Sequence, residues 1–132
     1  MFKKAFFILK INISMGNFKK LRVWQDAVNL AANIYHVTRK KPFAQDYGLC
    51  GQIQKAAVSV ASNIAEGDER RTNKEAIYFL NVAKGSSAEV ITQLHIAHRV
   101  GYLSDKTFEK LEDQTEKIRA SLKNLIKSKE KK

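Results

Sequence analysis

The 132-residue chain has little of the residues that interrupt regular structure, with one proline and six glycines. So few chain breakers favour a small number of long elements joined by short turns. The single cysteine, Cys50, excludes a disulfide framework and a cysteine-based zinc site, and it fits a reducing, cytoplasmic setting. We expect Cys50 to be a small buried hydrophobe rather than a nucleophile. No hydrophobic run approaches the length that spans a membrane.

Acidic residues are also scarce. The 13 Asp and Glu stand against 24 Lys and Arg and leave a formal net charge of +11. Such a surplus favours a polyanionic partner, nucleic acid first and an anionic membrane surface second. The alternative is a basic surface that keeps the protein soluble and binds no ligand.

The first fourteen residues, MFKKAFFILKINIS, contain lysines followed by an apolar stretch, which is loosely similar to an export signal. Lys10 interrupts that stretch and no small-residue cleavage site follows, so we reject export. We expect residues 1–17 to be a leader outside the fold and residues 18–128 to form one domain. Residues 129–132 are then a basic tail.

Four segments carry apolar residues at helical spacing, and no segment alternates like a strand. The first ends near Lys41, and the others run over about residues 46–66, 72–98 and 105–126. The connections are short, which places neighbouring helices antiparallel. The sequence therefore predicts an all-α fold, an antiparallel up-down-up-down four-helix bundle.

Each predicted helix has a line of residues expected to face the core. In the first two helices these are Leu21, Trp24, Val28, Ala31, Tyr35 and Thr38, with Ala27 and Ile34 beside them, and then Leu49, Ile53, Ala57, Val60 and Ile64. In the last two they are Ala76, Leu80, Ala83, Ser87, Val90, Leu94 and Ala97, and then Phe108, Leu111, Thr115, Ile118, Leu122 and Leu125.

The helix ends carry sequence signals as well. Thr72 and Glu75 form a capping-box pattern at the start of the third helix, and Ser104 is the expected N-cap of the fourth. Gly67 is predicted to end the second helix in the left-handed conformation, and Gly101 to stop the third.

The second and third helices lack charge on the side opposite their core lines. No charged residue occurs from Ala56 through Ala65, and Lys84 is the only one from Ala76 to Ala88. A helix without a charged face is buried on all sides, and in so small a bundle only another subunit can cover it. We therefore predict a homo-oligomer whose interface contains Val58, Ser62, Ala65, Tyr78, Asn81, Gly85, Ala88 and Ile96. The alternative is that these faces are merely polar enough to meet water.

Candidates for catalysis are few. His95 and His98 are three residues apart on a helix, a spacing that could bind metal, but no acid or third histidine sits at a matching offset. We interpret both as packing or surface residues. Asn63 and Glu66 could form a polar site, and the favoured interpretation is hydrogen bonding at the helix end. The sequence contains no catalytic triad pattern, phosphate-binding loop or dinucleotide motif, so we predict no enzyme, no cofactor and no metal.

Basic residues gather at one end of the predicted bundle, where the first helix begins, the second meets the third and the fourth ends. The predicted nucleic-acid-binding residues are Lys19, Lys20, Arg22, Arg70, Arg71 and Lys74, extended along the fourth helix by Arg119, Lys123 and Lys127. The lysines that follow Lys127 near the C-terminus are expected to add long-range electrostatic attraction for nucleic acid. Such a surface neutralises phosphates with strong salt dependence and little choice of sequence.

Three segments resemble the signature blocks of the bacterial four-helix bundle proteins, also called 23S ribosomal RNA intervening-sequence proteins. They are FKKLRVWQDAVNLAANIY, YGLCGQIQKAAVSVASNIAEGDER and FLNVAKGSSAEVITQLHIAHRVGYLS. The usual Pro-x-x-Glu entry to the second helix is blurred, since Pro42 is followed by Phe43, Ala44, Gln45 and Asp46. The resemblance implies a four-helix bundle that assembles as a ring of five, with no established activity. A more distant resemblance, to the accessory proteins of diversity-generating retroelements, implies binding to nucleic acid and a reverse transcriptase.

The sequence thus predicts a non-enzymatic cytoplasmic homo-oligomer that binds RNA or DNA through a basic surface and has no membrane partner. The alternative is an adaptor for another protein, such as a retroelement reverse transcriptase. A nuclease is disfavoured because clustered acids and histidines are missing.

Overall fold

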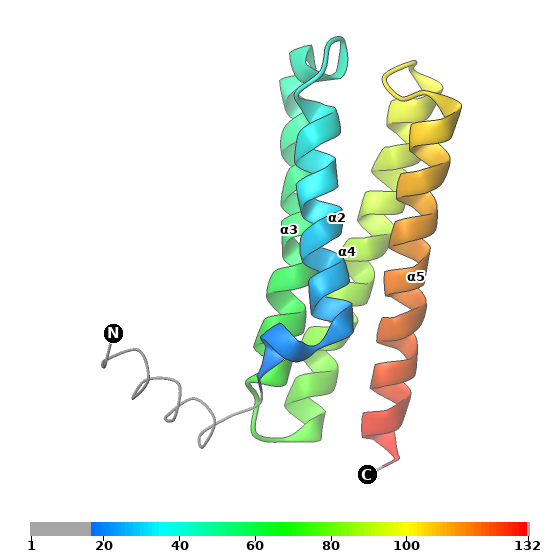
Figure 1. Ribbon diagram of the computed structural model, residues 1–132. Helices are drawn as coiled ribbons and strands as arrows, with labels where there is room; N and C mark the ends of the chain where they lie inside the picture. Colours follow the sequence, from blue (N-terminus) through cyan, green and yellow to red (C-terminus); the bar gives the residue numbers. More distant parts are fainter. Residues whose placement is uncertain (1–16, 132) are drawn as a thin grey trace.

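The computed structural model describes residues 17–131, and within them the chain is helical with no strand (Figure 1). The four long helices are α2 (Arg22–Thr38), α3 (Tyr47–Asp68), α4 (Asn73–Arg99) and α5 (Asp105–Glu130). The short 3-10 turns η1 (Phe18–Lys20) and η2 (Phe43–Gln45) precede α2 and α3. The predicted all-α fold of four helices is confirmed. The predicted leader lies outside the described residues except for Asn17.

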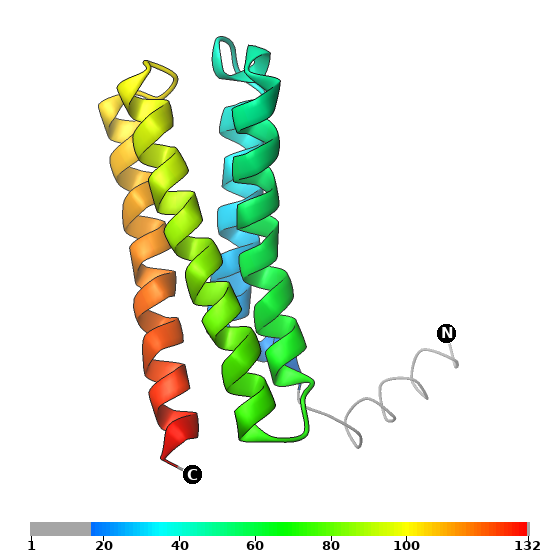
Figure 2. The same ribbon diagram turned by 180° about the vertical axis from the view of Figure 1, so that it is seen from behind.

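The helices form a bundle in which α3 packs against α2 and α4, and α5 packs against α4 and α2. Figures 1 and 2 show the connections from α2 to α3 and from α4 to α5 at the upper end of the molecule. The lower end holds η1, the turn between α3 and α4, and the end of α5. Segments far apart in the sequence therefore meet at the lower end.

Side-chain caps fix where three of the helices begin. Asp46 Oδ1 accepts from the Leu49 amide at 3.0 Å, Thr72 Oγ1 from the Glu75 amide at 3.2 Å, and Ser104 Oγ from the Thr107 amide at 3.1 Å. The N-caps predicted at Thr72 and Ser104 are confirmed.

The two glycines predicted to end helices behave differently. Gly101 has a φ of +89°, and the amides of Gly101 and Tyr102 donate to the carbonyls of His98 and Ala97 at 3.1 and 2.8 Å. This is the Schellman arrangement, so the stop at Gly101 is confirmed. The prediction for Gly67 was wrong, because it lies inside α3 and has no positive φ.

Gly67 is instead a point of close approach between α3 and α4. It is buried, and a β-carbon added to it would lie 3.2 Å from the carbonyl oxygen of Ala76 and 3.4 Å from Leu80. The missing side chain lets the first turn of α4 pack against the last turn of α3. The cap was predicted from a glycine that follows an apolar run. A glycine at a close contact between two helices gives the same sequence pattern.

The core is a single cluster that runs along the inside of the bundle. Every core position predicted for α4 is buried, as are Ile53, Ala57, Val60 and Ile64 of α3. On α5 the predicted line is buried up to Leu122, and at the end of the helix Ile126 is buried while Leu125 is half-buried.

The core line predicted for α2 was wrong in part. The buried residues are Val23, Ala27, Leu30, Ile34 and Thr38, whereas Val28 and Tyr35 are each 39% exposed. The apolar arc of α2 is wider than the surface that α3 and α5 cover. The neighbouring helices pack on the side of Leu30 and leave Val28 and Tyr35 on the surface.

Cys50 is buried at the upper end, as predicted. Its thiol donates to the carbonyl oxygen of Phe43 at 3.1 Å. Burial raises the pKa of the Cys50 thiol, and the negative charge of Asp46 raises it further. The thiol therefore stays protonated and is a poor nucleophile.

Candidate nucleic-acid interface

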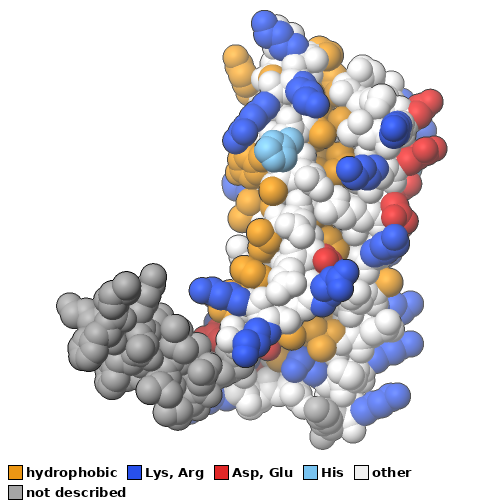
Figure 3. Space-filling view, viewed as in Figure 1, with side chains coloured by type: hydrophobic (Ala, Val, Ile, Leu, Met, Phe, Trp, Pro, Cys, Tyr) orange, Lys and Arg blue, Asp and Glu red, His pale blue; other side chains and the backbone are white. Residues whose placement is uncertain are grey.

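The lower end of the molecule brings together basic residues from three parts of the chain. The first helix begins there, the turn between α3 and α4 lies there, and α5 ends there (Figure 1). On the face drawn in Figure 3, Lys and Arg side chains outnumber acidic ones over this lower part. We call this surface the basic end and define it by Lys19, Lys20, Arg22, Arg70, Arg71, Lys74 and Lys127.

All nine predicted nucleic-acid-binding residues have exposed side chains, including Arg119 and Lys123, which lie further up α5. Three of the nine are paired with acids. Arg22 lies 3.2 Å from Asp26, Arg119 lies 3.4 Å from Glu116, and Arg70 pairs with Glu66. The other six have no acidic partner within residues 17–131: Lys19, Lys20, Arg71, Lys74, Lys123 and Lys127.

Arg70 is held in place by its own chain. Its guanidinium lies 4.6 Å from the centre of the Phe79 ring, and its Nε donates to the carbonyl oxygen of Glu66 at 3.2 Å. These contacts tie the end of α3 to the first turns of α4. Arg70 therefore stabilises the turn, whereas its neighbour Arg71 is exposed and has no acidic partner among the described residues.

The start of α4 adds to the positive potential of the basic end. Arg71 lies just before Thr72, the N-cap of α4, and Lys74 lies in the first turn of this helix. The N-terminus of a helix carries a partial positive charge from its unpaired amides. Phosphate oxygens that approach this turn meet side-chain and backbone donors together.

A contributor that the sequence interpretation missed is Lys84 of α4. It lines a cavity of about 270 Å³ together with Glu116, Arg119, Ala120 and Lys123 of α5. Lys84 is distant from these residues in the sequence, and only the packing of α4 against α5 brings them together. The basic surface therefore extends from the lower end up the seam between these helices.

The described residues contain no group of three or more histidine, cysteine or acidic side chains placed to hold a metal ion. His95 and His98 pack against Phe108, with ring centres 4.9 and 4.4 Å from the Phe108 ring. His95 also pairs with Glu112, and His98 Nε2 lies 2.7 Å from Asp105 Oδ1. The interpretation of both histidines as packing and surface residues is confirmed.

Asn63 and Glu66 make local contacts rather than a polar site. Asn63 Nδ2 donates to the carbonyl oxygen of Ser59 at 2.9 Å and to Ser59 Oγ at 3.0 Å. Glu66 pairs with Arg70 near the end of α3. Both side chains stabilise the last turns of this helix.

The predicted oligomer interface forms an open surface on the single chain. All of its residues are exposed except Ala65, which is half-buried. Tyr78, Ile96 and Val58 are 63%, 47% and 42% exposed, and Figure 2 shows α3 and α4 on the near side of the molecule. The single chain therefore leaves these predicted interface residues largely open to solvent.

No helix in the described part of the chain is long and apolar enough to cross a membrane. The fold and the surface define a class of protein: a small four-helix bundle with a basic surface.

Comparison with known proteins agrees with this class. The sequence profile of the 23S rRNA-intervening sequence protein family matches residues 19–124, and the chain belongs to this family. The resemblance seen in the sequence is thereby confirmed. A search of curated proteins finds no match.

A solved structure has the same fold. It is a protein of unknown function from the S23 ribosomal protein family of Bacteroides thetaiotaomicron, with a TM-score of 0.74 and 21% sequence identity. The similarity covers 80% of this chain and 98% of the other. At this identity the comparison establishes the fold alone.

Proposed function

We propose that this protein is a non-enzymatic, cytoplasmic RNA-binding protein. It works as a ring-like homo-oligomer of antiparallel up-down-up-down bundles and contacts RNA through the basic end. The observation that carries the proposal is the set of exposed basic side chains at that end without acidic partners among the described residues. RNA is favoured over DNA because the family is described by its link to 23S rRNA and the similar structure by a ribosomal protein family.

The proposed mechanism is neutralisation of phosphate charge. Lysine and arginine side chains at the basic end displace counterions from the RNA backbone, so affinity falls steeply as salt rises. The contacts are to phosphate and sugar and carry little sequence information. Assembly multiplies the basic end, so several weak contacts act together on one RNA.

The oligomer is supported by the low charge of the outer faces of α3 and α4. In contrast, α5 is charged at most positions outside its core line, as expected of a helix in water. An interface through α3 and α4 leaves α5 and its basic residues accessible. The RNA surface then meets the subunit interface only near the turn between α3 and α4, where Arg71 and Lys74 lie.

The proposal is tested by reversing charge at Arg71 and Lys74, which are exposed and without acidic partners among residues 17–131. We expect Arg71→Glu with Lys74→Glu to weaken binding of a structured RNA at least tenfold at low salt, because two phosphate contacts become repulsive. Fluorescence anisotropy at fixed ionic strength gives the affinity. Arg70 stays unchanged because its removal would disturb the turn.

The matched control reverses Lys40 and Lys41, which are exposed at the opposite end of the bundle. This variant has the same net charge as the first. The proposal fails if the two variants bind RNA equally well, or if neither differs from the unaltered protein.

The second candidate is an adaptor for another protein, such as a retroelement reverse transcriptase. The observation that favours it is the exposed apolar surface of α4, where Tyr78 is 63% exposed. Purification from the native host distinguishes the candidates, since an adaptor retains one defined protein partner after nuclease treatment and high salt.

A further inference from the structure

Side-chain contacts divide the surface of α3 into a side toward α2 and a side toward α4. Gln54 Nε2 donates to Thr38 Oγ1 of α2 at 2.9 Å. The hydroxyl oxygens of Ser59 and Ser86 of α4 lie 2.8 Å apart. Residues four, seven and eleven positions after Gln54 share its face of the helix. They are Val58, Ala61 and Ala65, which therefore lie toward α2.

An apolar stripe of α2 adjoins this side of α3. The α2 stripe consists of Trp24, Val28, Ala31 and Tyr35, spaced as one face of a helix. Val28 and Tyr35 are exposed, and no residue from Ala27 through Thr38 carries a formal charge. Figure 3 shows hydrophobic side chains gathered in a band along the edge where α2 meets α3. Trp24 and Ala31 are half-buried, and the Trp24 ring packs edge-on against Phe18, so the exposed part of the stripe within the described chain is Val28 and Tyr35.

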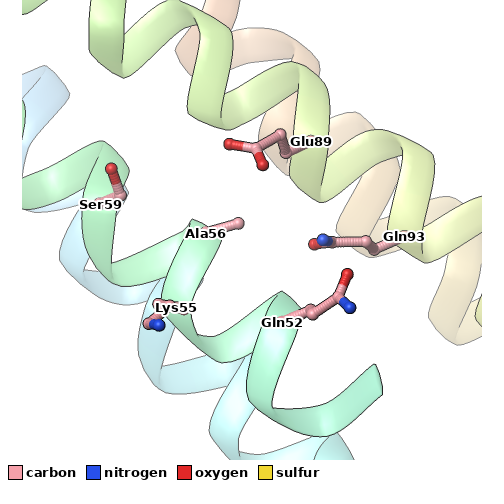
Figure 4. A pocket seen from close by; sticks show the side chains of 6 residues that line it. All are labelled: Gln52, Lys55, Ala56, Ser59, Glu89 and Gln93. Carbon is pink, nitrogen blue, oxygen red and sulfur yellow. The ribbon is translucent and has the colours of Figure 1, made fainter. Parts of the chain in front are cut away.

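The opposite side of α3 forms a groove with α4. The α3–α4 groove encloses about 330 Å³ and is lined by Gln52, Lys55, Ala56, Ser59, Glu89 and Gln93 (Figure 4). Val82, Glu89, Gln93 and Ile96 are spaced 7, 4 and 3 apart and share one face of α4. Val82 and Ile96 are 36% and 47% exposed, so apolar surface continues on both sides of the groove.

The groove contains a buried acceptor that lacks a donor. Gln93 is 8% exposed, and its Oε1 has no hydrogen-bond partner among the described residues. A buried carbonyl without a donor is unfavourable, and such groups in folded proteins are nearly always paired. A surface that fits this groove therefore carries an O–H or N–H group within an apolar patch.

The α2 stripe has the chemistry that the groove lacks. Tyr35 carries a hydroxyl and Trp24 an indole N–H, and the bonds of these groups are not satisfied by described residues of their own chain. The four stripe residues carry no charge, and the groove is lined by one basic and one acidic side chain, Lys55 and Glu89, whose charges cancel. The stripe and the groove lie on different sides of α3, so one copy cannot bring its own stripe to its own groove.

We propose that the α2 stripe of one copy packs into the α3–α4 groove of a second copy, head to tail. The inference rests on the homo-oligomer proposed above and specifies its geometry. Contact between two different surfaces produces a ring when the rotation closes, whereas a surface that binds itself produces only a pair. Each copy then covers one neighbour with its stripe and receives the other in its groove.

The test is a complementation experiment with one damaged surface in each variant. Tyr35→Asp places a charge on the stripe and Val82→Asp places one beside the groove. We expect each variant alone to sediment as a monomer. An equimolar mixture at high concentration forms a one-to-one dimer that grows no further, because one intact stripe meets one intact groove. Sedimentation velocity gives the masses.

Control variants separate failure of this inference from failure of the homo-oligomer proposal. Asn124→Asp adds the same charge on the exposed surface of α5 and retains the mass of the unaltered protein. Helical circular dichroism checks folding, and Val28→Asp replaces Tyr35→Asp if the latter unfolds. An unaltered protein that stays monomeric at every concentration overturns the homo-oligomer proposal. An oligomeric unaltered protein whose stripe variant keeps its mass, or whose two variants do not combine, overturns this inference alone.

Discussion

Single residues of this protein have roles that depend on what lies across from them. Gly67, Gly51 and Gly85 are all inside helices, yet only Gly67 meets another helix at short range. Arg70 and Arg71 are neighbours in the turn, yet Arg70 is stacked on Phe79 and paired with Glu66. Residue type alone therefore does not tell Gly67 from the other two glycines, or Arg70 from Arg71.

The contact at Gly67 leads to a prediction about stability. We expect Gly67→Ala to destabilise the fold by about 1 kcal/mol, because crowding of the Ala76 carbonyl outweighs the gain in helix propensity. Chemical denaturation measures the free energy of unfolding. Gly51→Ala is the matched control, since an added β-carbon there meets nothing within 4 Å and should stabilise the same helix. Equal effects of the two changes would contradict the close approach.

At the scale of elements, the upper end of the bundle is tied together by Asp46. Its side chain caps α3 and accepts a hydrogen bond from the Tyr102 hydroxyl at 2.9 Å, and Tyr102 stacks on Phe43. The Leu49 amide and the Tyr102 hydroxyl lower the pKa of Asp46. The start of α3 and the connection from α4 to α5 are thereby joined by an ionised side chain.

This arrangement predicts a pH dependence of folding. Because the Asp46 pKa is lower in the folded state, its contribution to stability is full above the pKa of the unfolded chain, about 4. This stabilising contribution is lost as the pH falls from the unfolded-state pKa through the lower folded-state pKa of Asp46. We expect Asp46→Asn to flatten the loss of thermal stability between about pH 5 and pH 2.

Tyr102→Phe provides the intermediate case, because it removes one of the two hydrogen bonds and keeps the aromatic stack on Phe43. Its stability profile should lie between those of the unaltered protein and Asp46→Asn. Thermal melting followed by circular dichroism at several pH values measures all three. Identical profiles would mean that Asp46 does not contribute.

At the scale of the whole molecule, the basic surface is assembled from η1, the α3–α4 turn, α4 and α5. Lys84 belongs to this surface only through its place across from Arg119 and Lys123. We expect Lys84→Gln to reduce the slope of log affinity for RNA against log salt by about one, as for loss of one phosphate contact. Titrations at several salt concentrations measure the slope. Lys40→Gln, at the far end, should leave it unchanged.

Much of the fold could be predicted because helical periodicity reports burial directly. On α4 the apolar residues form a single line, and this line was correctly predicted to face the core. On α2 the apolar residues cover more of the circumference, and periodicity cannot tell the arc that packs in the core from the arc beside it. Val28 and Tyr35 were therefore assigned to the core, although they lie on the surface.

The candidate site was less predictable than the fold, because part of it depends on contacts between helices that the periodicity of one helix does not reveal. Exposure of the nine basic residues follows from their charge, and the sequence indicated it. The pairing of Arg70 with Phe79, and the place of Lys84 beside α5, depend on distances across helices. No local pattern contains those distances.

The sequence by itself determined that the chain forms four helices, where caps such as Thr72 and Ser104 start them, and that its charge is strongly positive. These properties follow from local propensity, short-range hydrogen bonds and composition. Only the tertiary structure decided that Gly67 is a helix contact, that Val28 and Tyr35 of α2 are exposed, and that the Gln93 carbonyl is buried without a donor among the described residues. The reason is that burial and close approach depend on which helices pack together and at what rotation, and many rotations satisfy the same apolar pattern.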